Sequence, residues 1–339
     1  MYICKTCSLP ENYPGMQMGK NGSCNYCQFY EEHKSILTDY DNLESAFLNY
    51  LAQAKETAAK NGSRYDCLVG FSGGKDSTYI IYQLKEKYNM RVLAFTYDNG
   101  FCTDYGRNNI NKVLEQINVD YQTFKPNVQT SQFLNREAVK FAKHFCAVCF
   151  HQMHYYSLLT AKEKGIPLII NGRSRGQVLQ RALETQYLEP FMPTYGLKQF
   201  EYQMLKKVNE KMNQAGDASG RIDYLDGVNI QMLSYFMYHS YDADKIVEFL
   251  QKKINWEPPK KGEKHPDCWA HNMAEYFHLE RSGFPQSTGE LAVEVREGKV
   301  KREDAISQME QDRKHYQMVS KEEQMRFYDT IAYKEGVKS

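Results

Sequence analysis

The sequence predicts an α/β fold: a doubly wound parallel sheet, preceded by a cysteine-rich segment and followed by a mainly helical region. Three observations lead to this prediction. Between residues 64 and 190, short apolar runs alternate with amphipathic helical patterns, as strands alternate with crossover helices. A glycine-rich turn joins the first apolar run to the helical pattern behind it, and two pairs of cysteines precede this region. We therefore divide the chain into residues 1–34, 35–63, 64–190 and 191–339.

The composition limits the class of protein. Of the 339 residues, 42% are hydrophobic and 25% are charged, which is ordinary for a globular chain and excludes a mostly disordered one. The 43 lysines and arginines nearly balance the 42 aspartates and glutamates, so the surface as a whole does not attract polyanions. No apolar run approaches the ~20 residues that span a bilayer, and the N-terminus lacks a secretory signal pattern. We expect a cytoplasmic protein with no membrane partner.

The first segment, residues 1–34, is expected to be a zinc ribbon. Its four cysteines form two Cys-x-x-Cys pairs, Cys4 with Cys7 and Cys24 with Cys27. Each pair places two thiolates within reach of one tetrahedral ion, and four thiolates leave no open coordination position. We therefore expect a structural zinc ion. The alternative is four unrelated thiols, since disulfides are rare in the cytoplasm.

The second segment, residues 35–63, reads as a helical connector. Its apolar residues recur at spacings of three and four, which gives one apolar stripe, and Asn61-Gly62-Ser63 supplies a helix stop. The third segment contains the strands and helices of the predicted sheet. Strands are expected at residues 67–71, 91–97, 119–124 and 167–171, and helices at residues 76–88, 104–117, 132–143 and 150–164. Beyond residue 190 the strand signals fade, and we expect a helical substrate or partner region.

The turn after the first strand reads Ser72-Gly73-Gly74-Lys75-Asp76-Ser77. Glycines let backbone N–H groups turn inward, and the N-terminus of the following helix adds partial positive charge. With the serine hydroxyls and the Lys75 ammonium, this turn predicts an anion cradle. It is not a Walker A loop, because Val69 occupies the first-glycine position and Asp76 follows the lysine. The alternative is a turn between strand and helix that binds no ligand.

This motif resembles the PP-loop of the ATP pyrophosphatase (adenine nucleotide α-hydrolase) superfamily, whose fold is a Rossmann-like doubly wound sheet. The resemblance covers about residues 64–190. It implies cleavage of ATP between the α and β phosphates, with transfer of AMP to a substrate oxygen that nitrogen or sulfur then displaces. Lys75 is expected to stabilise the leaving pyrophosphate. Asp76 is expected to hold Mg²⁺, or to serve only as a carboxylate at the helix N-terminus.

Two further strand ends are expected beside the nucleotide. In the resembling enzymes the end of the second strand lies there, so Asp98 is a candidate for a ribose or adenine contact. A plain Asn-Gly turn is the alternative. The fourth strand ends at Asn171, and the carboxyl end of such a strand opens on the ligand crevice. Gly172, Arg173 and Arg175 therefore become candidates for contacts to phosphate or a substrate anion, with solvated surface arginines as the alternative.

The N-terminal segment is similar to that of the N-acetyl sugar amidotransferases. The similarity lies in a Cys-x-x-Cys pair, a Leu-Pro and a Pro-Gly turn, and then Gly-x-Cys-x-x-Cys ahead of a PP-loop. The segment from Gly298 to Ile306 is similar to one near that family's C-terminus, or is simply a helix start. The resemblance implies conversion of an acetamido group of a bacterial surface-sugar precursor to an acetamidino group. It also implies a separate glutaminase subunit that supplies ammonia, and a homodimer.

A second set of cysteines suggests a different donor. Cys146 and Cys149 form another Cys-x-x-Cys pair, and Cys268 stands far along the chain. This arrangement resembles the iron–sulfur tRNA thiolases of the same superfamily, which implies a [4Fe-4S] cluster and sulfur transfer to tRNA or a small molecule. A catalytic persulfide, a redox pair or inert buried thiols are alternatives. The net charge of +1 argues against tRNA. A nucleotide-binding adaptor without catalysis is the remaining hypothesis.

Overall fold

The computed structural model describes residues 2–141, 146–180, 194–195, 230–259 and 265–333. These residues form a sheet of six strands in the order β3-β2-β1-β4-β6-β5. All neighbours pair in parallel except β5, which lies antiparallel to β6 at one edge. The strands are β1 Cys67–Gly70, β2 Val92–Tyr97, β3 Asp120–Phe124, β4 Leu168–Asn171, β5 Thr194–Tyr195 and β6 Gln231–Ser234.

Helices cover both faces of the sheet, which confirms the predicted doubly wound α/β fold. Successive side chains of β1 alternate between two apolar clusters, as the pleat of a strand requires. Cys67 and Val69 belong to the larger cluster, with α2 (Tyr40–Lys60), α3 (Lys75–Tyr82) and α4 (Asp104–Ile117). Leu68 belongs to the cluster on the opposite face, with α6 (Cys146–Glu163). Strands buried on both faces need apolar residues throughout, which is why their sequences read as continuous apolar runs.

The helices around the sheet follow the prediction with few exceptions. The expected helix at 104–117 is α4, and the expected helix at 150–164 begins earlier, as α6. The expected helix at 132–143 is α5, Val128–Phe141. The expected helix at 76–88 is α3, which continues as one π-helical turn over Gln83–Lys87.

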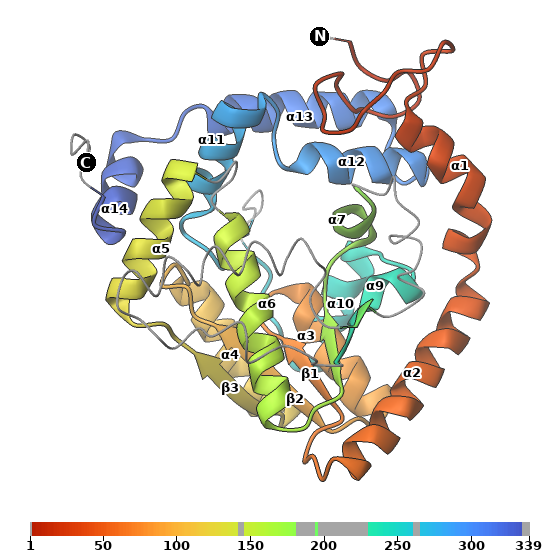
Figure 1. Ribbon diagram of the computed structural model, residues 1–339, viewed down its shortest axis with the longest axis vertical. Helices are drawn as coiled ribbons and strands as arrows, with labels where there is room; N and C mark the ends of the chain where they lie inside the picture. Colours follow the sequence, from red (N-terminus) through yellow and green to blue (C-terminus); the bar gives the residue numbers. More distant parts are fainter. Residues whose placement is uncertain (1, 142–145, 181–193, 196–229, 260–264, 334–339) are drawn as a thin grey trace.

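The connector before the sheet is two helices, not the single one predicted for residues 35–63. Helix α1, Asn25–Thr38, begins inside the cysteine-rich segment, directly after Cys24. Asp39 ends it and then caps α2 by accepting a hydrogen bond from the Asn42 backbone N–H. Figure 1 shows α1 and α2 running along one side of the molecule, from the N-terminal segment to the sheet.

The region beyond residue 190 contributes to the sheet, which the sequence did not predict. Strand β6 pairs with β4 over its whole length, and the short helix α9, Tyr235–Tyr238, follows at once. Apart from β5, the other elements that the structure describes there are helices, as expected: α10 Ala243–Ile254, α11 His271–Ser282, α12 Ser287–Arg296, α13 Arg302–Tyr316 and α14 Lys321–Thr330. In Figure 1, α11, α12 and α13 lie together at the end of the molecule where the N-terminal segment packs. Helix α12 also packs on α7, Arg175–Leu179, which follows β4.

None of the helices that the structure describes is both long and apolar enough to cross a membrane.

Candidate functional site

The glycine-rich loop after β1 has a backbone that only glycine adopts easily. Gly73 has a φ of 77°, in the left-handed region that favours glycine. A Cβ on Gly73 would lie 2.8 Å from the backbone oxygen of Gly106, at the start of α4. Gly74 is extended and precedes the first residue of α3. The loop is thus pressed against α4, and α3 begins directly after it without a hydrogen bond from a side-chain cap.

The hydroxyl groups of this loop fix its shape. The Ser77 hydroxyl donates to the Gly74 carbonyl at 3.2 Å and accepts from the Ser72 backbone N–H at 3.4 Å. The Ser72 hydroxyl accepts from the Gly74 N–H at 3.3 Å, on the exposed side. The predicted anion-cradle residues Ser72, Gly73, Gly74, Lys75 and Ser77 therefore lie together around one helix N-terminus.

A partly buried ion pair lies at the end of this loop. Lys75 Nζ lies 2.8 Å from Asp76 Oδ2, and both side chains are less than a third exposed. The other carboxylate oxygen, Asp76 Oδ1, is buried and has no hydrogen-bond partner among the described residues. A buried carboxylate oxygen that lacks a donor is costly, so it marks a place for a cation or a donor from a ligand. Asp76 fits the oxygen ligand that Mg²⁺ prefers.

Tyr241 completes the electrostatics around this pair. Its ring lies 5.6 Å from Lys75 Nζ. Burial by itself would lower the pKa of Lys75, but the charge of Asp76 and the neighbouring Tyr241 raise it above its ordinary value. Burial, followed by the charge of Asp76, raises the pKa of Tyr241 to about 12. At neutral pH the site therefore holds a charged ammonium and a neutral phenol.

The end of β4 lies directly against the loop. A Cβ on Gly172 would lie 3.3 Å from the Cβ of Asp76. Arg173 lies just beyond it, with its guanidinium 5.3 Å from the centre of the Phe150 ring and a hydrogen bond of 2.8 Å to the Gln177 carbonyl. The Arg173 charge also lowers the pKa of Glu290 on α12 against the larger effect of burial, which raises it to about 7.

Arg175 has a structural environment. Its side chain is 1% exposed, and its three nitrogens donate to the Glu297 carboxylate and to the carbonyls of Met237 and Leu37, at 2.7, 3.2 and 2.7 Å. A guanidinium with all its nitrogens engaged inside the protein ties four segments together. We therefore remove Arg175 from the anion-binding candidates.

Asp98, at the end of β2, forms a turn of its own. Its carboxylate accepts a hydrogen bond of 2.9 Å from the Gly100 N–H and lies 3.5 Å from Lys125 Nζ. The neighbouring Asn99 donates to Cys149 Sγ at 3.2 Å. The end of β2 therefore connects to the second set of cysteines, and Asp98 forms the turn that was the alternative to a nucleotide contact.

The second set of cysteines gathers beside the same edge of the sheet. Cys102 and Cys268 face each other in an antiparallel bridge. Burial, followed by the charge of Cys149, raises the pKa of Cys268 to about 12. Burial and the charges of Cys149 and Cys268 raise the pKa of Cys146, and burial raises that of Cys149. Cys146, Cys149 and Cys268 are thus within electrostatic range of one another, although within the described part of the chain their sulfur atoms do not all lie within 4.8 Å.

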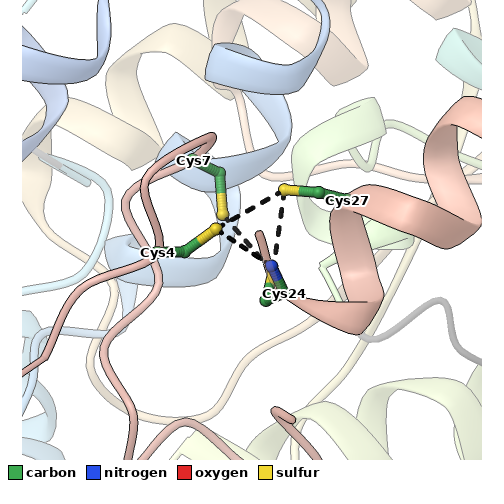
Figure 2. Close-up of side chains that lie close together, drawn as sticks. All are labelled: Cys4, Cys7, Cys24 and Cys27. Atoms are coloured by element: carbon green, nitrogen blue, oxygen red, sulfur yellow. Dashed lines mark hydrogen bonds between the residues drawn. The ribbon is translucent and has the colours of Figure 1, made fainter. Parts of the chain in front are cut away.

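The N-terminal cysteines form a compact group, shown in Figure 2. The sulfur atoms of Cys4, Cys7, Cys24 and Cys27 all lie within 4.8 Å of one another and are buried. Three of the sulfur–sulfur distances are 3.8, 3.8 and 3.6 Å. Tetrahedral ligation with bonds of about 2.3 Å places sulfurs about 3.8 Å apart, whereas a disulfide bond is about 2.0 Å long. The four thiols are therefore arranged as a tetrahedral metal site.

This cysteine group is joined to the C-terminal helices. Arg302, the first residue of α13, donates from Nε to the backbone oxygens of Cys4 and Cys7, at 2.8 and 2.9 Å. The Tyr13 hydroxyl donates to the Gln180 carbonyl just beyond α7, and Asn12 donates to the Ser282 carbonyl at the end of α11. The cysteine-rich segment is thus an integral part of the fold.

Two residues near the loop, Trp256 and Tyr241, were not predicted from the sequence. Trp256, just past the end of α10, donates from its indole nitrogen to the Gly73 carbonyl at 3.0 Å, and Tyr241 precedes the same helix. Trp256 is separated from Gly73 by 183 positions in the sequence. Local periodicity carries no signal for such a contact, so only the folded chain reveals it.

Comparison with known proteins finds partial likenesses. No protein-family model matches the chain. It is 22% identical over 251 residues, 74% of each chain, to an uncharacterised protein of Methanocaldococcus jannaschii. A likeness to the U34-tRNA thiolase of Methanococcus maripaludis, solved with its [4Fe-4S] cluster, covers 93% of this chain and 89% of that one, with 14% identity and a TM-score of 0.37.

Two synthetases show similar likenesses. The NMN synthetase of Francisella tularensis is 12% identical over 70% of this chain and 93% of its own, with a TM-score of 0.32. The NH₃-dependent NAD synthetase of Campylobacter jejuni, in complex with nitrate, is 14% identical over 67% of this chain and all of its own, also with a TM-score of 0.32.

Proposed function

We propose that this chain is an ATP pyrophosphatase-type enzyme that transfers AMP to a carbonyl or amide oxygen of its substrate and releases pyrophosphate. The observation that carries the proposal is the loop at residues 72–77. It combines a glycine with positive φ, a free helix N-terminus, a charged Lys75 and a buried Asp76 oxygen without a partner in the described chain. The sequence of this loop is also that of a PP-loop.

We assign a part to each residue of the loop and its surroundings. The α and β phosphates separate as negative charge develops on the leaving pyrophosphate, and the backbone N–H groups of Gly74 and of the first turn of α3 stabilise it there. Lys75 adds a full positive charge at the same place. Asp76 would hold Mg²⁺, which supplies further charge neutralisation to the phosphates. Gly172 leaves room beside Asp76, and Arg173 and Asp98 are assigned to the nucleotide or substrate.

For the second half-reaction we propose nitrogen as the incoming nucleophile, as in the N-acetyl sugar amidotransferases. An amide oxygen is a poor leaving group until it carries AMP, after which ammonia attacks the carbon and AMP departs with the oxygen. The N-terminal cysteine pattern and the segment after Gly298 support this choice, and Arg302 of that segment contacts the cysteine group. We propose zinc for that group, because its sulfur spacing fits tetrahedral thiolate ligation.

The test uses the purified protein with Mg-ATP, ammonium and a set of N-acetylated sugar nucleotides. The expected result is one AMP and one pyrophosphate for each product, with the mass change of replacing oxygen by an imino group. At high concentration, ammonium would replace the ammonia that a glutaminase subunit supplies. Glutamine alone should not support the reaction. Absence of AMP formation with every acceptor, while the protein binds Mg-ATP, would favour a nucleotide-binding adaptor.

Sulfur is a second candidate, favoured by one observation. Cys146 and Cys268 pack against the same apolar cluster, and Asn99, which follows β2, donates to Cys149 at 3.2 Å. For this second candidate we assign the three cysteines to the ligation of an iron–sulfur cluster, or Cys149 or Cys146 to a persulfide. Protein prepared without oxygen would then be brown and contain acid-labile sulfide, and Cys268→Ala would lose the colour whereas Cys4→Ser would keep it. A colourless protein with about one zinc per chain would support nitrogen transfer.

A further inference from the structure

Trp256 is a buried residue just past the end of α10. It follows Asn255, which has a φ of 51° and ends α10, and its backbone N–H donates to the Leu250 carbonyl. The side chain is 4% exposed. Its indole nitrogen donates to the Gly73 carbonyl in the interior, at 3.0 Å. The first of the two loop glycines is therefore anchored by a residue 183 positions further along the chain.

This anchor fixes more than the carbonyl. The Gly73 carbonyl and the Gly74 N–H belong to one planar trans peptide, so they point in opposite directions. The carbonyl faces inward to Trp256, and the Gly74 N–H faces the exposed side, where it donates to the Ser72 hydroxyl. A rotation of this peptide would turn the N–H away from the open side of the loop. The indole N–H therefore determines where the Gly74 donor points.

The segment that carries Trp256 is held firmly from the other side. The carbonyl of Glu257 accepts hydrogen bonds from the Tyr105 hydroxyl at 2.7 Å and from Asn109 Nδ2 at 3.2 Å, both on α4. The Glu257 carboxylate pairs with Lys112 on the same helix. Because Gly106 of α4 is the group that a Cβ on Gly73 would meet, the loop is held between α4 and Trp256.

We propose that Trp256 is a positioning residue for the anion cradle: its indole N–H aims the Gly74 N–H at the pyrophosphate part of ATP. The proposal rests on the function proposed above. Indole is suited to this task because it is a donor only and carries that donor at the end of a large apolar body. Without it the Gly73 carbonyl would lack a buried donor, and the peptide would be free to turn toward another.

The test is Trp256→Phe, which keeps an aromatic ring and removes the N–H. We expect Mg-pyrophosphate and Mg-ATP to bind about tenfold more weakly and AMP, which lacks that part of ATP, to bind as before. The matched control is Trp269→Phe, the same change at the other of the two tryptophans, whose ring lies 5.1 Å from Phe101. The control should bind pyrophosphate as wild type does, and its remaining indole should change fluorescence when pyrophosphate binds.

A second variant isolates the N–H from the shape of the ring. In the Trp269→Phe background, replacing Trp256 with β-(3-benzothienyl)alanine substitutes sulfur for the indole N–H and keeps the ring outline, so it covers the case in which Trp256→Phe fails to fold. The same selective loss of pyrophosphate binding is expected. Equal pyrophosphate affinity in variant and control, or equal weakening of pyrophosphate and AMP, would overturn the positioning role. A wild-type protein that binds neither ATP nor pyrophosphate would instead overturn the proposed function itself.

Discussion

Lys75 and Asp76 are adjacent residues whose side chains form an ion pair of 2.8 Å. Because both side chains are partly exposed to solvent, this ion pair contributes little to the stability of the fold. The Asp76 oxygen without a partner among the described residues shows that the pair is not a closed structural ion pair. Each side chain stands at the start of α3 and outside the apolar clusters. Substitution should therefore affect ligand binding and chemistry more than folding.

We expect Lys75→Ala and Asp76→Ala each to reduce turnover more than tenfold, because each removes charge or cation binding at the separating phosphates. Release of pyrophosphate would be measured with circular dichroism as the check on folding. Lys85→Ala is the matched control, since Lys85 lies on the turn after α3 and bonds the Asn118 carbonyl. Unchanged turnover in both loop variants would contradict the proposed mechanism.

Gly73 offers a second test at the same scale. Gly73→Ala should abolish measurable Mg-ATP binding, because a Cβ there meets a backbone oxygen at 2.8 Å and the φ of 77° is strained for alanine by about 1 kcal/mol or more. Gly70→Ala is the control, since a Cβ on Gly70 has no described atom within 4 Å and its φ is ordinary. Calorimetric titration of both variants with Mg-ATP compares them, and wild-type affinity in Gly73→Ala would show that the loop does not hold the phosphates.

What the sequence reveals of this site depends on how local the signal is. Ser72 to Ser77 were predicted because the loop residues are consecutive and the chemistry of the turn is written in their order. Arg175 could not be separated from Arg173 by sequence, because the two differ only in what surrounds them in the fold. Trp256 and Tyr241 gave no signal at all, since their partners stand far away along the chain.

At the scale of elements, the junction of α7 and α12 brings several ionisable side chains close to Glu290. A Cβ on Gly176 would lie 3.2 Å from the Cα of Glu290, so the two helices touch at this point. Burial, the charge of Glu294 and, to a smaller extent, that of Glu275 raise the pKa of Glu290 to about 7, and Gln177 and Arg173 oppose the rise. The folded protein thus binds a proton at Glu290 that the unfolded chain, with an ordinary pKa near 4.5, releases.

This difference predicts a pH dependence of stability. Glu290 contributes stability that is fully present below pH about 4.5 and is lost as pH rises through about 7, because the unfolded state binds fewer protons in that window. Glu290→Gln should remove this contribution to the pH dependence and be more stable than wild type at pH 8 by roughly 1–3 kcal/mol. Urea unfolding at several pH values measures it, with the exposed Glu310→Gln as control. Parallel pH profiles for wild type and Glu290→Gln would contradict the prediction.

Elements were predictable where a strong period spans a whole element. The helix at Asp104–Ile117 was expected at these very bounds, because Thr103 caps it and its apolar residues keep one face. Strand β6 was missed because it is four residues long and runs straight into an aromatic helix, so alternation and helical spacing overlap. The early start of α1 could not be predicted, because the spacing of Cys24 and Cys27 indicates only metal ligands. In the fold Cys24 directly precedes the helix and Cys27 lies in its first turn.

At the scale of the whole molecule, distant parts of the chain complete one another. Strand β6, from the region expected to be mainly helical, extends the sheet beside β4. The N-terminal cysteine group packs against Phe284, which precedes α12, and Ala292, which lies in it. The Cys4 carbonyl accepts a hydrogen bond from Arg302 of α13. The fold class could be predicted from local patterns, but these long-range joins could not, because they depend on which surfaces remain to be covered.

These joins predict the effect of removing the metal site. Cys4→Ser should release zinc and lower the midpoint of thermal unfolding. Residual Mg-ATP binding should persist below that temperature, because the glycine loop is held by α4 and Trp256 and not by the cysteine group. Differential scanning calorimetry and zinc analysis measure both effects, with Cys67→Ala as a core substitution that keeps the metal. Complete loss of ATP binding in a Cys4→Ser protein that is still folded would contradict this separation of roles.

The contact between Cys4 and Arg302 also bears on how the chain is made on the ribosome. The cysteine group is synthesised first, whereas the helix that receives it is translated almost three hundred residues later. At elongation speeds of roughly 5–20 residues per second, the nascent N-terminus is synthesised on the order of fifteen seconds to a minute before the helix on which it docks. Early capture of an ion by the four thiols would keep that segment ordered and protected from oxidation and proteases during the delay.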